Sequence, residues 1–163
     1  MSYDLMVFRK EAAPKVRNDF MEWFRAQVTW SEDHSYNDPA NSSPELRDWF
    51  MEMIESFPSL NGPFASFEYD NPRIADYCIG RDVIYVAFTW SVPEQAYDKM
   101  YELAKKHGVG FFDVSNDDGD ILFPENGTLK SIDNGPGKNI VIPEIIKQIR
   151  LQDKKSKPWW KFW

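Results

Sequence analysis

Two apolar runs separated by only two residues place the firmest constraint on the fold of this chain. Residues 74–79 and 82–90 both have the β-branched and aromatic composition of strands, and Gly80-Arg81 alone connects them. A connection this short joins neighbouring antiparallel strands, because a parallel crossover needs a dozen or more residues. The sequence therefore predicts a β-hairpin near the middle of the chain, and the remaining elements must fit an antiparallel sheet.

Helical periodicity appears on both sides of this hairpin. Apolar residues recur every three or four positions over 15–29, 44–57 and 93–107, which is the spacing of one buried helix face. Gly108 directly follows the third of these segments, where a glycine commonly ends a helix. Three amphipathic helices are therefore expected, two of them before the hairpin and one after it.

The expected order of elements is β-α-α-β-β-α-β-β-α. The further strands are short apolar runs, and they lie at 3–8, 109–114 and 121–123. Residues 124–138 are expected to form a loop, and 143–152 a final helix. This order predicts an α+β fold with a mainly antiparallel sheet and helices packed on one face. The specific prediction is a variant of the ferredoxin-like sandwich with an extra helix after the first strand.

Length and composition indicate one globular domain followed by a tail. The chain has 163 residues, of which 42% are hydrophobic and 28% are charged. We expect a single domain over 1–152 and a basic-aromatic tail over 153–163. Aromatic residues make up 16% of the chain, so rings are available both for the core and as interface anchors.

The charge is unevenly distributed along the chain. The net charge is −7, but from Arg150 onward five basic residues face one acid, which leaves −11 on the first 149 residues. An acidic body repels nucleic acid and attracts basic proteins. No nucleic-acid partner is therefore expected. The acidic balance has two explanations, which are attraction of a basic protein partner and solubility alone.

The expected location is the cytoplasm. Cys78 is the only cysteine, so no internal disulfide can form. The N-terminal residues lack the basic region and apolar run of a signal peptide. No apolar stretch approaches the roughly 18 residues that are needed to span a bilayer.

The first candidate site is a polar loop at 31–38. Its candidate binding residues carry carboxylate, imidazole or phenol groups, and they are Glu32, Asp33, His34, Tyr36 and Asp38. Imidazole and carboxylates are metal ligands, but adjacent residues rarely converge on one ion, and the spacing matches no metal-site pattern. A hydrogen-bonded structural loop or a partner surface is the favoured interpretation, and no metal site is predicted.

The second candidate is an acidic turn over 113–120, with Asp117, Asp118 and Asp120 as candidate contact residues. A calcium-loop alignment fails at its first position, where Val114 offers no oxygen ligand. A β-hairpin turn is the favoured interpretation. No catalytic residue and no cofactor can be assigned, because no nucleotide-binding glycine pattern is present. An enzyme is the less favoured class.

The C-terminal tail interleaves lysines with large aromatic residues, which are Trp159, Trp160, Phe162 and Trp163. Interfacial membrane contact uses this chemistry, and so does single-stranded nucleic-acid binding, which the acidic body disfavours. Fold-back onto the acidic domain or disorder is the favoured interpretation, ahead of docking in a protein partner and of membrane contact.

Three segments carry a resemblance to known proteins: TyrAspLeuMetValPhe at 3–8, TrpSerGluAspHisSerTyrAsnAspPro at 30–39 and LysHisGlyValGlyPhePheAspValSer at 106–115. Together they resemble a family of bacterial proteins to which no activity is assigned, over most of residues 1–124. More loosely, the chain is similar in size, acidity, aromatic content and fold class to immunity proteins of polymorphic toxin systems. Neither resemblance supplies catalytic residues.

These observations leave two main hypotheses. The first is a cytoplasmic protein-binding domain, specifically an immunity-type inhibitor that meets a basic toxin through the 31–38 loop and the 117–120 turn. The alternative is a small enzyme or ligand-binding domain, with a site around the 31–38 loop or on the open face of the sheet, and with His34 as its base.

Overall fold

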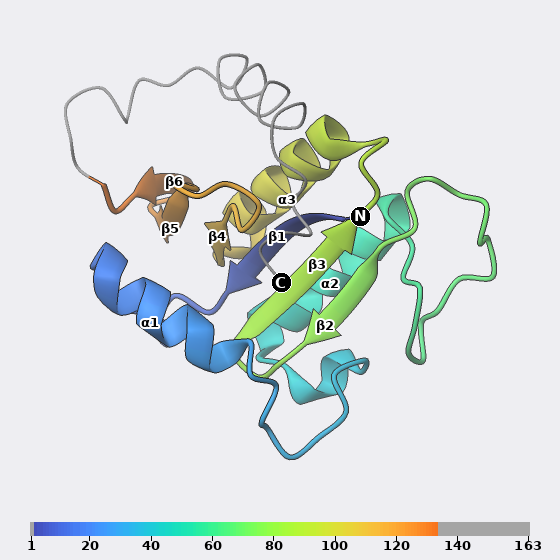
Figure 1. Cartoon of the computed structure of the whole chain (residues 1–163), viewed down its shortest axis with the longest axis horizontal. Helices are drawn as coiled ribbons and strands as arrows, with labels where there is room; N and C mark the ends of the chain where they lie inside the picture. Colours follow the sequence, from blue (N-terminus) through green and yellow to red (C-terminus); the bar gives the residue numbers. More distant parts are fainter. Residues whose placement is uncertain (1, 134–163) are drawn as a thin grey trace.

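Six antiparallel strands form one open sheet in the computed structural model, which describes residues 2–133 (Figure 1). Their order across the sheet is β2-β3-β1-β4-β5-β6. The strands are β1 (Tyr3–Phe8), β2 (Asp76–Ile79), β3 (Val83–Phe88), β4 (Gly110–Phe112), β5 (Ile121–Glu125) and β6 (Thr128–Ser131). The predicted α+β class with an antiparallel sheet is therefore confirmed.

The first four strands have the topology of a ferredoxin-like sandwich. β1 lies between β3 and β4 and is antiparallel to both, while β2 pairs with the outer edge of β3. The chain thus passes through two interleaved β-α-β units, as the element order predicted. β5 and β6 then extend the sheet beyond β4.

The helices cover both faces of the sheet, so the prediction that they pack on one face is wrong. α2 (Pro44–Ser56) and α3 (Pro93–His107) share a core with Leu5 and Val7 of β1. Met6 and Phe8, which point the other way, pack against α1 (Arg17–Gln27). A strand that is buried on both faces has no polar alternation, and the continuous apolar run over residues 5–8 of β1 is the sequence sign of this arrangement.

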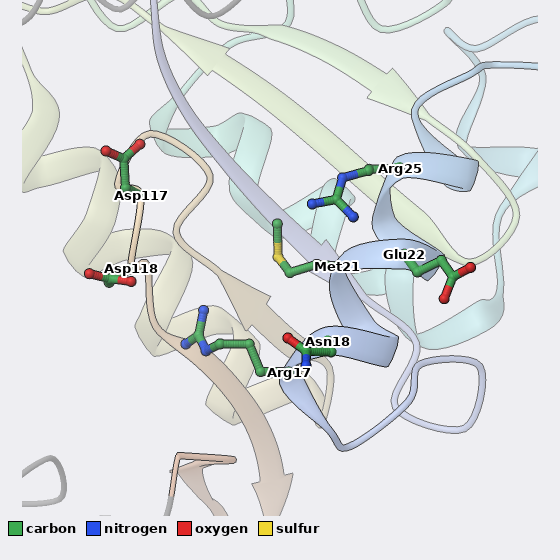
Figure 2. A pocket seen from close by; sticks show the side chains of 7 residues that line it. All are labelled: Arg17, Asn18, Met21, Glu22, Arg25, Asp117 and Asp118. Atoms are coloured by element: carbon green, nitrogen blue, oxygen red, sulfur yellow. The ribbon is translucent and has the colours of Figure 1, made fainter.

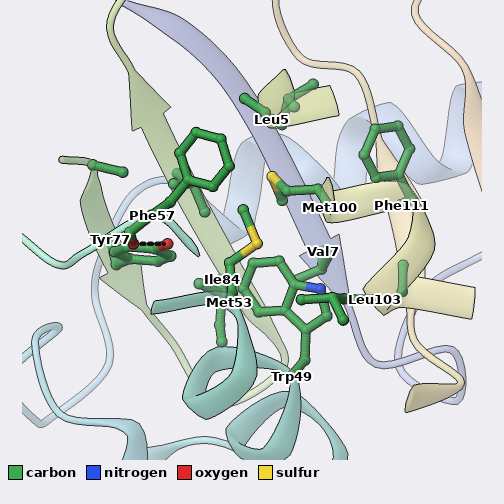
Figure 3. Close-up of a cluster of buried hydrophobic side chains, with 14 of the residues drawn as sticks. Leu5, Val7, Trp49, Met53, Phe57, Tyr77, Ile84, Met100, Leu103 and Phe111 are labelled. Atoms are coloured by element: carbon green, nitrogen blue, oxygen red, sulfur yellow. Dashed lines mark hydrogen bonds between the residues drawn. The ribbon is translucent and has the colours of Figure 1, made fainter. Parts of the chain in front are cut away.

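The larger core lies between the sheet and the α2–α3 pair (Figure 3). Trp49 and Met53 of α2 face Met100 of α3 across this cluster. The Tyr77 hydroxyl of β2 donates a 2.7 Å hydrogen bond to the Phe57 carbonyl oxygen at the end of α2. This bond satisfies the polar end of a ring that is otherwise buried among apolar side chains.

The smaller core lies under α1 and is built mainly from rings. Phe8 of β1 contacts Phe20 and Phe123 with centroid distances of 5.1 Å each, in edge-to-face geometry. Gly110 of β4 makes room for Phe8, since an added Cβ there would lie 2.1 Å from Phe8 Cε2. β4 therefore approaches β1 this closely only with glycine at position 110.

The expected loop at 124–138 contains a strand that the sequence analysis missed. Asn126 and Gly127 both have positive φ, 53° and 78°, and they connect β5 to β6 in a tight hairpin. Asn-Gly is the dipeptide that such turns favour, so the signal was present in the sequence. The expected helix at 143–152 and the tail at 153–163 lie outside the described residues, as does the predicted domain boundary between them.

Candidate functional site

The predicted site residues of the 31–38 loop mainly contact the loop itself and its neighbours. The Glu32 carboxylate accepts a hydrogen bond from the Arg81 backbone N–H at 3.1 Å, and its Oε1 lies 3.4 Å from His34 Nε2. His34 Nδ1 lies 2.7 Å from the Ser35 carbonyl oxygen. The Tyr36 hydroxyl accepts a 2.5 Å hydrogen bond from the Glu32 backbone N–H. These contacts shape the loop rather than converge on an open cavity.

The same loop is fixed to the β2 edge of the sheet. The Ile79 backbone N–H donates to the Tyr36 carbonyl oxygen at 2.8 Å, so Tyr36 partly continues the sheet beyond β2. Asp38 Oδ1 accepts from the Ala40 backbone N–H and thereby begins the short 3₁₀ helix η1 (Pro39–Asn41). Asp33 is exposed. Among the five candidates in this loop, Asp33 is therefore the most accessible to a partner.

The acidic turn lies beside α1 and forms one wall of a hollow of about 490 Å³ (Figure 2). Asp117 and Asp118 line this hollow from the turn, and α1 contributes Arg17, Asn18, Met21, Glu22 and Arg25. Arg17 donates to the Gly119 carbonyl oxygen at 2.9 Å and forms an ion pair with Asp133. The Asp120 carbonyl oxygen accepts from the Asp113 backbone N–H at 3.1 Å. The charges in this hollow are mixed, and Arg17 holds the turn in place.

The two predicted contact surfaces do not form one site. The acidic turn contacts α1 at Arg17, the first residue of the helix, whereas the 31–38 loop follows its last residue, Gln27. The hollow that Asp117 and Asp118 line also includes Met21 and, in the last turn of α1, Arg25. The acidic turn therefore borders the side of α1, whereas the 31–38 loop continues from its C-terminal end.

A third surface, which carries none of the predicted site residues, is the loop over 58–73. It carries four large hydrophobic residues that are strongly exposed: Phe67 at 84%, Tyr69 at 67%, and Leu60 and Phe64 at 43% each. In Figure 1 the loop projects from the body of the molecule between α2 and β2. Hereafter this segment is called the aromatic loop. The sequence feature that could have indicated this surface is the occurrence of several aromatic residues in a segment whose prolines and glycine disfavour regular secondary structure.

The backbone of the aromatic loop is fixed by hydrogen bonds at its base. Ser66 N–H donates to the Ser59 carbonyl oxygen at 2.7 Å, and Leu60 N–H donates to the Ala75 carbonyl oxygen at 2.9 Å. Nearer the tip, the Asn71 side-chain amide donates to Glu68 Oε2 at 3.1 Å. The exposed rings therefore project from an ordered backbone.

Cys78 and His107 both have surroundings that indicate a structural role rather than a catalytic one. Cys78 is half-buried on the α1 face of the sheet, where burial and then the nearby Asp76 raise the pKa of its thiol to about 12. A thiol of this kind is a poor nucleophile near neutral pH. His107 Nε2 lies 2.9 Å from Glu52 Oε1, which links the end of α3 to α2.

Within residues 2–133, no three histidine, cysteine, aspartate or glutamate side chains are grouped so that they could hold a metal ion. In the same range, no helix has both the length and the apolar character to cross a membrane.

Comparison of the chain with protein-family models, with curated proteins and with solved structures gave no match. The resemblance to a bacterial family and to immunity proteins therefore stays a prediction. The function has to be inferred from the residues of this chain.

Proposed function

We propose that this protein is a protein-binding domain that docks a basic partner through its aromatic loop. The observation that supports this most directly is the exposure of Phe67 and Tyr69, at 84% and 67%, on a loop whose base is held by backbone hydrogen bonds. Large exposed rings lose little conformational entropy on binding and bury much surface, which is why aromatic residues are common among interface hot spots. Leu60 and Phe64 enlarge the apolar surface around them.

The charge of the domain indicates the kind of partner. Residues 2–133 contain 24 aspartates and glutamates against 12 lysines and arginines, a formal net charge of −12. Glu68 and Asp70 alternate with the two exposed rings along the loop. Apolar anchors flanked by acids fit a basic surface, because opposite charge speeds the encounter while the rings supply contact area.

The narrower form of this proposal is an immunity-type inhibitor that blocks the active site of a toxin. Nuclease-like active sites are basic because they bind phosphates, and an acidic domain with aromatic anchors suits such a cleft. The alternative of an enzyme centred on His34 has less support, because His34 and Glu32 are engaged with Ser35, Arg81 and each other.

The test is affinity capture from host lysate, comparing the wild type with the double variant Phe67→Ala/Tyr69→Ala. Val16→Ala is the matched control, because Val16 is 62% exposed but lies beside α1. We expect one basic protein to be retained by the wild type and the control, and to be lost from the double variant and at high salt. Both loop residues are exposed, so the free energy of unfolding should change by less than about 0.5 kcal/mol.

A second measurement examines the inhibitor form. The captured protein is purified and its activity is titrated with the wild type, the double variant and Val16→Ala. Stoichiometric inhibition by the wild type and the control, but not by the double variant, is the expected result. Equal capture by all three proteins would overturn the role of the aromatic loop, and capture that is unchanged by salt would overturn the basic partner.

A further inference from the structure

A second hollow, of about 270 Å³, lies on the face of the sheet that α1 covers only in part. Its floor is formed by alternate residues of three neighbouring strands. Asp76 of β2, Ala87 of β3 and Asp4 of β1 form one cross-strand row, and Cys78 and Tyr85 belong to the next. Ala87 is the small residue between two carboxylates, so the hollow opens above it. Its volume is close to the lower end of small-molecule sites, roughly 300–1,000 Å³.

Asp4 supplies a buried acceptor at this floor. The residue is only 3% exposed, and its Oδ2 accepts a 2.6 Å hydrogen bond from the Tyr85 hydroxyl. Its other oxygen, Oδ1, is buried and has no hydrogen-bond partner of ordinary geometry within the described residues. The backbone of Asp4 is fixed through Ser115, whose hydroxyl accepts from the Asp4 N–H at 2.7 Å and whose N–H donates to the Asp4 carbonyl oxygen at 3.2 Å. Buried carboxylate oxygens normally have donors, so Oδ1 has capacity for one.

The wall of the hollow is aromatic. Trp30 lines it, and its ring meets the Tyr85 ring edge-to-face at 6.1 Å and the Tyr36 ring at 5.2 Å. Trp30 has a φ of 52°, which is uncommon for a bulky residue and which the ring contacts help to maintain. An aliphatic chain or a cation that entered the hollow would therefore contact ring surfaces.

The field inside the hollow favours positive charge. Its lining includes two carboxylates and no lysine, arginine or histidine. Burial is the largest influence on the Asp4 carboxyl and raises its pKa; the Ser2 hydroxyl, the Tyr85 hydroxyl and the charge of the N-terminal ammonium oppose this rise, and the negative charge of Asp76 adds to it. Asp76 is itself positioned by the Asn61 side-chain amide at 2.7 Å. An incoming cation would be attracted to both carboxylates.

The groups around this hollow suit an organic cation better than a metal ion. In the described part of the chain, residues 2–133, no three histidine, cysteine, aspartate or glutamate side chains are grouped so that they could hold a metal ion. An ammonium group instead needs one fixed acceptor and an apolar wall for its alkyl chain. Asp4 and the two rings provide these.

We propose that this hollow binds a primary alkylammonium group, with its nitrogen donating to Asp4 Oδ1 and its alkyl chain lying against Trp30 and Tyr85. This site is separate from the aromatic loop. A negative result for the ammonium site therefore leaves the proposed protein-binding function untouched, and the reverse also holds. The group can come from a free small amine or from a lysine side chain, including those of residues 154–163 of this chain.

The experiment is a titration of the full-length protein with n-butylammonium. Isothermal calorimetry measures the affinity, and the indole N–H signals in NMR spectra report binding near tryptophan. The control ligand is n-butanol, which has the same alkyl chain and a similar size but no charge. Asp4→Asn removes the charge but keeps the side-chain volume, and Asp48→Asn makes the same change at an exposed position of α2. A fourth protein carries Lys154→Gln, Lys155→Gln, Lys157→Gln and Lys161→Gln together.

Two outcomes support the proposal and identify the source of the amine. If the wild type binds n-butylammonium, and Asp4→Asn weakens binding by about tenfold or more while Asp48→Asn changes it less than twofold, the hollow accepts a free amine. If binding appears, or becomes at least several-fold tighter, only in the lysine-to-glutamine protein, and is lost again when Asp4→Asn is added, the lysines of the chain itself are the source.

Three outcomes overturn it. The first is no binding to either the wild type or the lysine-to-glutamine protein. The second is equal binding of n-butanol and n-butylammonium. The third is binding that Asp4→Asn leaves unchanged. If Asp4→Asn does not fold, Asp76→Asn takes its place with a several-fold weakening expected, and unchanged binding in that variant would overturn the proposal.

Discussion

The phenolic hydroxyl of Tyr85 donates a 2.6 Å hydrogen bond to Asp4 Oδ2, and this bond joins two neighbouring strands on the face of the sheet that α1 covers in part. Tyr85 and Asp4 are diagonal neighbours, since Tyr85 is paired with Met6 and Asp4 with Ala87. The bond holds Oδ2 of the buried Asp4 carboxylate in place and thereby sets the position of Oδ1. Substitutions at Tyr85 or Asp4 can therefore test both the stability of the fold and the proposed ammonium site.

Removing the hydroxyl should destabilise the protein near neutral pH. Tyr85→Phe keeps the ring contacts with Trp30 but leaves Asp4 Oδ2 without its donor. Hydrogen bonds to charged groups contribute about 1.5–3 kcal/mol, so we expect the free energy of unfolding in urea at pH 7 to fall by that amount. Tyr69→Phe is the control, because Tyr69 is 67% exposed. An equal loss in both variants would contradict the role given to this bond.

Neutralising Asp4 should change how stability depends on pH. Burial raises the pKa of Asp4 above its ordinary value of 3.8, so ionisation of this group disfavours the folded state. The cost is fully present above the folded-state pKa and disappears as pH falls below 3.8, where the carboxyl is neutral in both states. We therefore expect Asp4→Asn to gain stability relative to the wild type at pH 7, and this gain to shrink on acidification.

Urea unfolding of the wild type and of Asp4→Asn at several pH values measures that difference directly. Other titrating groups are common to both proteins, so their effects cancel. A stability difference that stays constant with pH, or that grows at low pH, would contradict the raised pKa of Asp4.

Cys78 should react slowly with alkylating agents in the folded protein. Its pKa of about 12, raised from 9.0, lowers the thiolate fraction at pH 8 by about a thousandfold. Higher intrinsic nucleophilicity offsets part of this, so the expected alkylation by iodoacetamide is roughly 30–60-fold slower than that of a free peptide thiol. Mass spectrometry follows the reaction, because Cys78 is the only cysteine.

Two controls accompany the alkylation experiment. The protein in concentrated urea should react at the rate of an ordinary thiol, since burial is the largest cause of the raised pKa. Asp76→Asn should speed the reaction of the folded protein modestly, because Asp76 is the smaller cause. A fast reaction of the folded wild type would show that the thiol is more exposed than the structure indicates.

Arg17 should be needed to hold the acidic turn against α1. Its guanidinium donates to the Gly119 carbonyl oxygen and pairs with Asp133, so it links α1 to the turn and to the residues after β6. Arg17→Gln should increase hydrogen exchange of the Gly119 amide, which bonds the Asn116 carbonyl oxygen. Arg25→Gln, on the same helix and beside the same hollow, should leave that exchange unchanged. Equal exchange in the two variants would contradict the linking role of Arg17.

The topology was accessible from the sequence because it depends on local signals. The short connection at Gly80-Arg81 indicated antiparallel pairing of β2 with β3, and the 3.6-residue periodicities located α2 and α3. The missed strand β6 was also encoded locally, by Asn126-Gly127. That error came from reading glycine and asparagine as a loop composition instead of as a turn type.

The placement of α1 was predicted wrongly because it depends on which face of β1 a helix covers. Periodicity shows that one side of α1 is apolar, but it does not say which of two apolar sheet faces will receive it. The buried rows Leu5–Val7 and Met6–Phe8 are equally apolar in the sequence, and only tertiary packing assigns them to different helices.

The sequence by itself determined the element order from β1 to β5, the acidic balance and the presence of polar clusters at 31–38 and 113–120. Tertiary structure alone decided that the acidic turn lies beside α1, that Phe67 and Tyr69 are exposed, and that Asp4 meets Tyr85 across 81 positions of chain. The physical reason is the sequence separation over which each kind of interaction acts. Propensity, periodicity and turn chemistry act over a few residues, whereas burial and charge pairing depend on neighbours that only strand pairing brings together.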